Sequence, residues 1–189
     1  MKFVRVLLWI LLGIVLVPAS LLGWLRFGKV PVAVADPPLP QERLLTAMPL
    51  NARIDREPAK SPVIQPDEDY LVAGAHVYIE KCALCHGLHA KPSQIGANMF
   101  PHAPKLWEKH RNSTVVGVSD DPPSETYWKV ANGIRLTGMP AYKQMLTDTE
   151  IWQVSLLLAN ADKPLPPAAL EILRGELPAP EAAAPATTP

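Results

Sequence analysis

The stretch Cys82-Ala83-Leu84-Cys85-His86-Gly87 determines what the rest of this chain folds around. It places two thiols three positions apart and an imidazole directly after the second thiol. Because side chains three residues apart on a helix lie on one face, both sulfur atoms can reach the same bound group. The stretch therefore predicts a site in which two sulfurs and one ring nitrogen act together.

This spacing is typical of a covalent attachment site for haem c. Cys82 and Cys85 would form thioethers with the two vinyl groups of one porphyrin, and His86 would bind the iron. We therefore predict one haem c as the cofactor, held by Cys82, Cys85 and His86, with His86 as a metal ligand.

Three other uses of the cysteines are open. The sequence contains 2 Cys, so a zinc site would need further histidines, and their spacing matches no common zinc finger. These histidines, which we expect to lie exposed in loops, are His76, His89, His102 and His110. A thioredoxin-like redox pair would need a βαβ context, which the sequence pattern does not show. A disulfide in an oxidising compartment would leave His86 unexplained.

The composition excludes some function classes and divides the chain. The 189 residues carry 18 basic and 18 acidic side chains, and this balance implies no nucleic-acid partner. The 22 prolines gather outside the central region. We predict a membrane anchor at 1–28, a Pro-rich linker at 29–66, a haem domain at 67–163, and a short helix with a disordered Ala/Pro-rich tail at 164–189.

The N-terminus has the composition of a membrane span. Lys2 and Arg5 precede an uncharged apolar run from Val6 to Leu25. About 20 apolar residues in a helix are long enough to cross the hydrocarbon core, so membrane lipid is a predicted partner. The alternative is a cleaved signal peptide ending near Ala33-Val34-Ala35, although the run is longer than a typical signal core.

The linker is predicted to be an extended, semi-rigid spacer because prolines recur along it. Residues 41–48 are the part of it that could form a short helix. Beyond the haem domain, residues 167–174 predict another short helix that Gly175 ends.

Three helices are predicted in the haem domain. The first follows the capping residue Asp67 and runs to about Cys85. The second covers residues 124–132, after two prolines and before Gly133. The third covers residues 147–160, which begin with the capping box Thr147-Asp148-Thr149-Glu150.

The first and third helices are expected to cross. Gly74 and Tyr78 lie four residues apart and share a face, and the glycine would let another helix approach closely. The facing surface on the third helix is predicted to consist of Trp152, Leu156 and Ala159.

With these features in place, the chain resembles the class I, monohaem c-type cytochromes over about residues 68–162. The resemblance implies an all-α cytochrome c fold, in which three main helices surround one covalently bound haem, here preceded by a transmembrane helix. It also implies that haem is attached outside the cytoplasm. We therefore expect a single-pass protein of the bacterial inner membrane whose haem domain faces the periplasm.

The resemblance also implies the second axial ligand. In the family, a Gly-Met-Pro segment similar to Gly138-Met139-Pro140 supplies it, so the role passes to Met139 as a haem-binding residue and metal ligand. A thioether is a soft ligand, and Met/His ligation raises the reduction potential. Met99 and Met145 also follow the haem motif and are the alternatives.

Two further haem-site residues come from the same likeness. Pro104 resembles the family proline whose carbonyl accepts the other imidazole N–H, and Pro101 competes for that role. Trp128, like Trp107, could line the haem pocket or donate to a propionate, although core packing is the alternative for both.

These features predict an electron carrier rather than an enzyme. With His86 and Met139 filling both axial positions, the iron would have no open site for a small-molecule substrate. The expected partner is a redox protein, bound transiently or stably. Two alternatives remain: a permanent cytochrome c subunit of a membrane oxidoreductase complex, such as a dehydrogenase or terminal oxidase, and a haem sensor or peroxidase.

Overall fold

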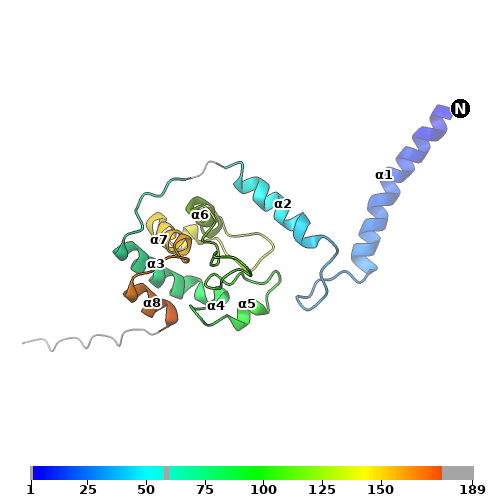
Figure 1. Ribbon diagram of the computed structural model, residues 1–189. Coiled ribbons are helices and arrows are strands. Elements are labelled where there is room, and N and C mark those ends of the chain that lie inside the picture. The colour runs from blue at the N-terminus through cyan, green and yellow to red at the C-terminus, as the bar shows by residue number, and fades with distance from the viewer. Residues whose placement is uncertain (1, 58–59, 176–189) are drawn as a thin grey trace, which may run out of the picture. The chain divides into compact units, whose positions relative to one another are not determined.

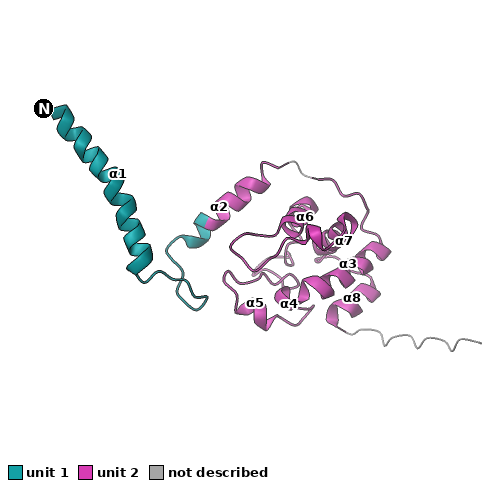
Figure 2. Cartoon of the chain, turned by 180° about the vertical axis from the view of Figure 1, so that it is seen from behind, with its two compact units in different colours: residues 1–45 teal, residues 46–189 magenta. Residues whose placement is uncertain are grey.

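A computed structural model describes residues 2–57 and 60–175 of the protein. These residues form helices (Figure 1). Their β-structure is limited to two isolated bridges, Leu88–Lys91 and Lys109–Val116. The predicted all-α class is therefore confirmed. The chain divides into two compact units, residues 1–45 and residues 46–189 (Figure 2). The predicted tail at 176–189 lies outside the described residues.

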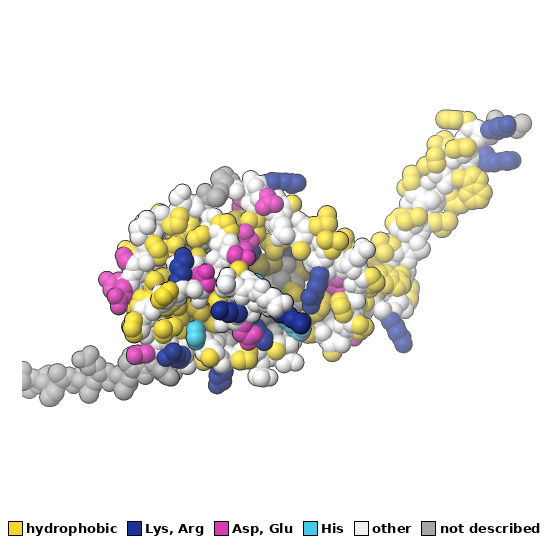
Figure 3. All heavy atoms as spheres, viewed as in Figure 1, with side chains coloured by type: hydrophobic (Ala, Val, Ile, Leu, Met, Phe, Trp, Pro, Cys, Tyr) yellow, Lys and Arg dark blue, Asp and Glu magenta, His cyan; other side chains and the backbone are white. Residues whose placement is uncertain are grey.

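Helix α1, Lys2–Phe27, contains the apolar run. Its most apolar stretch of 18 residues has a mean hydropathy of 2.5, and none of that stretch is buried in the protein. Figure 3 shows the apolar side chains on its surface. By length and composition the helix can cross a membrane, a test that a signal sequence also passes.

Helix α2, Glu42–Ile54, is longer than the predicted 41–48 segment and contains Pro49. The Glu42 carboxylate accepts a hydrogen bond of 2.8 Å from the Leu39 N–H, which supports the start of the helix. An internal proline removes one backbone donor, and the helix nevertheless continues past it. The expected extended spacer is therefore replaced by a helix over residues 42–54.

Helix α3, Glu68–Lys81, and helix α7, Asp148–Ala159, pack against each other as predicted, with Gly74 at the contact. A Cβ added at Gly74 would lie 2.5 Å from the backbone oxygen of Gln153 and 3.2 Å from Cβ of Leu157. These nearest atoms belong to Gln153 and Leu157, and not to the predicted face of Trp152, Leu156 and Ala159. Trp152 instead stacks on Tyr127 of helix α6, Pro123–Asn132, with ring centroids 4.3 Å apart.

The ends of these helices follow local sequence signals. The Asp67 side chain accepts from the Tyr70 N–H at 2.9 Å, which caps α3. Thr147 and Glu150 form both bonds of the predicted capping box on α7. Helix α6, Pro123–Asn132, ends at Gly133, which has a φ of 66°.

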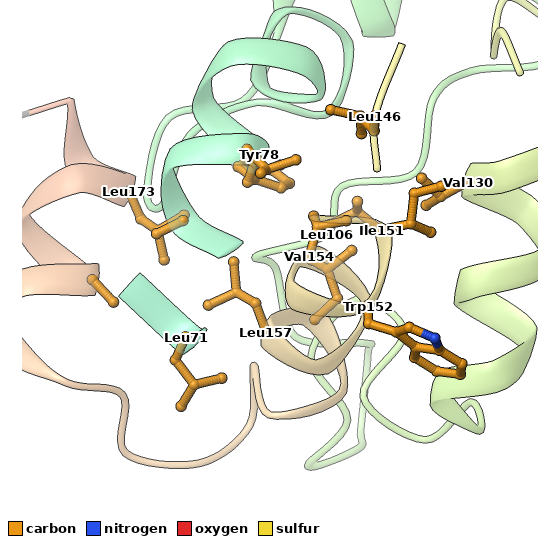
Figure 4. Close-up of a cluster of buried hydrophobic side chains, with 14 of the residues drawn as sticks. Leu71, Tyr78, Leu106, Val130, Leu146, Ile151, Trp152, Val154, Leu157 and Leu173 are labelled. Carbon is orange, nitrogen blue, oxygen red and sulfur yellow. The ribbon is translucent and has the colours of Figure 1, made fainter. Parts of the chain in front are cut away.

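The core gathers side chains from α3, α6, α7 and helix α8, Pro167–Arg174. Figure 4 labels Leu71, Tyr78, Leu106, Val130, Leu146, Ile151, Trp152, Val154, Leu157 and Leu173. Ala169 and Leu173 of α8 are fully buried, and α8 packs on α3. The sequence pattern did not indicate that this short helix would add to the same core as the haem domain.

The helix that was predicted to run from Asp67 to about Cys85 is interrupted at the haem motif. Helix α3 ends at Lys81, and the short helix α4, Ala83–His86, begins after Cys82. The long loop that follows contains helix α5, Gln94–Ala97. A 3₁₀ turn, η1, at Tyr142–Gln144 precedes α7.

Candidate functional site

The two thiols of the motif lie on α4 and the residue before it. Cys82 and Cys85 are half-buried and form no disulfide. Burial, and then the neighbouring Cys85, raise the pKa of the Cys82 thiol to about 12, so this thiol is protonated at neutral pH. Because a redox-active cysteine needs a lowered pKa, the thioredoxin-like alternative has no support here.

The imidazole of His86 is fixed in one tautomer by a backbone carbonyl. Its Nδ1 donates to the oxygen of Pro104 at 2.8 Å, whereas Pro101 has no such contact. Burial lowers the pKa of His86, so the ring is neutral at neutral pH. Across the described residues Nε2 has no hydrogen-bond partner, and its lone pair is available to a metal.

The backbone around the motif is tightly supported. The Tyr78 hydroxyl donates to the oxygen of Gly87 at 2.7 Å, and the Ser93 hydroxyl donates to the oxygen of Leu84 at 2.5 Å. Gly87 has a φ of 85°, a region that glycine adopts without strain. These bonds fix the short helix α4, which contains Cys85 and His86 and directly follows Cys82.

Met139 lies in a loop that folds back on itself after α6. At Gly133 an added Cβ would lie 2.7 Å from the amide nitrogen of Ala141, so the two ends of the loop touch. Within it, Ile134 N–H donates to the oxygen of Met139 at 3.2 Å, and Met139 N–H donates to the Thr137 hydroxyl at 3.1 Å. The loop therefore holds Met139 through its own hydrogen bonds.

The other two methionines lie near this loop. The methyl group of Met99 packs directly over Gly138, where an added Cβ would overlap it. Met145 follows η1 and is 54% exposed. Met139 itself is half-buried and packs against the core. Its assignment as ligand stays a prediction, and Met99, whose methyl group contacts Gly138, and Met145 stay the alternatives.

The two tryptophans have different surroundings. The Trp128 indole N–H donates to the carboxylate of Glu57, a partner that the sequence did not indicate. Trp107 is buried and packs edge-on against Tyr78, with centroids 5.4 Å apart. Donation from Trp128 to a haem propionate remains a prediction, and Glu57 competes for the same N–H.

The histidines outside the motif do not form a metal site among the described residues. His102 and His110 are exposed and lie outside helices, as predicted. The prediction is wrong for the other two, because His76 is exposed on α3 rather than in a loop and His89 is half-buried. Within residues 2–57 and 60–175, no three His, Cys, Asp or Glu side chains group as metal ligands. The arrangement therefore gives no support to a zinc site.

The donor set fits haem c. It combines two unpaired thiols, on α4 and the residue before it, with a neutral imidazole whose Nε2 is available, and the methionine loop packs against the same core. Figure 3 shows a hollow near the centre of the domain face that it draws. Thioether formation and iron ligation need this combination of groups.

Comparison with known proteins agrees with this arrangement. A family model described as cytochrome C oxidase, cbb3-type, subunit III matches residues 71–156. The match begins in α3, includes the haem motif and the Met139 loop, and ends in α7. No curated protein and no solved structure matches the chain significantly. Residues 71–156 are a c-type cytochrome domain, with the cytochrome c fold and covalently bound haem c as its cofactor.

Proposed function

We propose that this chain is an electron-transfer protein tethered to the bacterial inner membrane, with its haem domain on the periplasmic side and with His86 and Met139 as axial ligands. The observation that carries the proposal is the fixed, neutral His86 imidazole beside two unpaired thiols. When bound, haem c supplies one-electron chemistry between Fe(II) and Fe(III).

The chain's own residues position the ligands and exclude other chemistry. The carbonyl of Pro104 orients the ring of His86, and the Thr137 hydroxyl and Ile134 amide fix the backbone of Met139. Such second-layer hydrogen bonds orient metal ligands and tune the potential. Two filled axial positions would leave none for a substrate, which supports a carrier and not an enzyme.

The tether would serve the same function. Helix α1 is long and apolar enough to span a bilayer. Confinement to the membrane surface raises the effective concentration near a membrane-bound partner. Redox partners commonly meet through small, transient interfaces, so a redox protein is the proposed partner.

A second candidate is a permanent cytochrome c subunit of a membrane oxidoreductase complex. The name of the matching family, which is that of an oxidase subunit, favours it. Purification of the full chain in mild detergent separates the two functions. A carrier is expected to elute alone, whereas a subunit would elute with stoichiometric amounts of other polypeptides.

The ligand assignment is tested by the spectrum of the ferric protein. Met139→Ala is expected to abolish the weak long-wavelength charge-transfer band of methionine-ligated haem and to lower the reduction potential. The matched controls Met99→Leu and Met145→Leu should keep the band. Loss of the band in Met99→Leu with retention in Met139→Ala would move the ligand to Met99.

Carbon monoxide binding by the unsubstituted reduced protein would favour the sensor or peroxidase function.

A further inference from the structure

Tyr142 connects the end of the Met139 loop to the start of the haem motif, which lie far apart in the sequence. It is the first residue of η1 and follows Met139 by three positions. Its hydroxyl donates to the backbone oxygen of Lys81 at 2.7 Å, across 61 positions of sequence. Lys81 is the last residue of α3 and immediately precedes Cys82.

The acceptor is a carbonyl that the helix itself leaves without a donor. The last carbonyls of an α-helix have no intrahelical N–H partner and need one from elsewhere. Here the chain leaves α3 at Cys82 and begins α4 at Ala83, so the next turn supplies no N–H donor to the Lys81 oxygen. The N–H groups of Cys85 and His86 both go to the oxygen of Cys82 instead.

The same bond orients the residue that carries the first thiol. The carbonyl of Lys81 and the amide nitrogen of Cys82 belong to one planar peptide unit. That amide donates in turn to the oxygen of Tyr78 at 2.8 Å. Holding both ends of the peptide plane fixes the direction in which the chain enters Cys82.

At its other end, Tyr142 is anchored to the core. The N–H groups of Met145 and Leu146 donate to the Tyr142 carbonyl at 2.7 and 2.9 Å. Leu146 is 9% exposed and belongs to the buried cluster. The Tyr142 backbone is therefore a fixed point at the end of the Met139 loop, and its hydroxyl reaches from there to α3.

We propose that Tyr142 is a positioning residue that sets the separation between the Met139 loop and the Cys82 end of α3. The inference rests on the proposed ligation by Met139. Without the hydroxyl, the Lys81 carbonyl loses its donor, and η1 loses its direct hydrogen bond to the Cys82 end of α3. Met139 would then compete less well with an added ligand.

The test is imidazole binding to the purified ferric full chain, with wild type, Tyr142→Phe and Met139→Ala compared. Phenylalanine keeps the ring and removes only the donor. Loss of one hydrogen bond predicts that Tyr142→Phe binds imidazole several-fold to about tenfold more tightly, with a lower reduction potential. Tyr127→Phe is the matched control, because the Tyr127 hydroxyl bonds to Lys60 and Asp148 and not to Lys81. It should leave imidazole affinity unchanged.

The outcomes separate this inference from the proposed function. Wild-type imidazole affinity in Tyr142→Phe, with a large increase in Met139→Ala, would overturn the role of Tyr142 alone. Wild-type affinity in Met139→Ala would overturn the proposed ligand itself. If Tyr142→Phe yields no holoprotein, 3-fluorotyrosine placed at position 142 gives a stronger donor. It should weaken imidazole binding, and an unchanged affinity would contradict the inference.

Discussion

At the scale of single residues, Gly74 determines how closely α3 and α7 approach. A side chain there would meet the backbone oxygen of Gln153 at 2.5 Å, and a backbone atom cannot move aside as a rotamer can. Gly74→Ala should therefore destabilise the domain by up to about 2 kcal/mol, even though alanine favours a helix by about 1 kcal/mol. Urea unfolding followed by circular dichroism measures this change.

Gly13→Ala is the control for this substitution, since its added Cβ meets nothing within 4 Å. It should leave the urea midpoint of the domain unchanged. A Gly74→Ala protein as stable as the unsubstituted one would show that α3 and α7 can separate freely.

The residues of the site differ in how far the sequence could predict them. The motif specified Cys82, Cys85 and His86 because their chemistry depends on adjacent positions. The bond from Tyr142 to Lys81 and that from Trp128 to Glu57 join residues 61 and 71 positions apart. No local pattern encodes such pairs, because they depend on how the helices pack.

At the scale of elements, the capping box of α7 makes the helix sensitive to pH. Hydrogen bonds from the Thr147 backbone and side chain lower the pKa of Glu150 below its ordinary value of 4.5. Because the folded pKa is the lower one, this stabilisation is complete above the unfolded pKa. It is lost as the pH falls through the folded value. Glu150→Gln should flatten that part of the stability–pH curve, and a slope equal to wild type would contradict the assignment.

Thr147→Ala tests the other half of the capping box. It removes the acceptor for the Glu150 N–H and should cost about 1 kcal/mol at neutral pH. The urea midpoint measures it. An unchanged midpoint would mean that tertiary packing alone determines where α7 begins.

Helix α8 is expected to contribute to the stability of the cytochrome domain. Leu173 is fully buried against the core, so Leu173→Ala should cost about 2–5 kcal/mol. Leu45→Ala, at a side chain that is 64% exposed, is the control and should change stability by no more than about 0.5 kcal/mol. Equal effects of the two substitutions would show that α8 is dispensable.

The elements also show where sequence patterns are sufficient. Asp67, the capping box and Gly133 mark helix ends correctly because capping depends on a few neighbouring residues. The break at Cys82 and the extension of α2 past Pro49 were not predicted. Likewise, the pattern of Trp152 identified a buried side chain but not its partner, Tyr127, which belongs to another helix.

At the scale of the whole molecule, the chain comprises two compact units, and α1 belongs to the first. If α1 is a retained anchor, the full chain should stay with membranes after an alkaline carbonate wash. Its intact mass should then include residues 1–28. Leu11→Arg with Val15→Arg should abolish anchoring, because each arginine costs about 2.5–3.5 kcal/mol at the centre of a span. A soluble protein that begins near residue 36 would instead show a cleaved signal peptide.

The whole account depends on a haem joined to the polypeptide through Cys82 and Cys85. The most direct measurement is to denature the purified protein in acid, extract it with organic solvent, and weigh the polypeptide by mass spectrometry. The account predicts that the colour stays with the polypeptide, whose mass equals the chain plus one haem. Colour in the organic phase and a polypeptide of unmodified mass would contradict it.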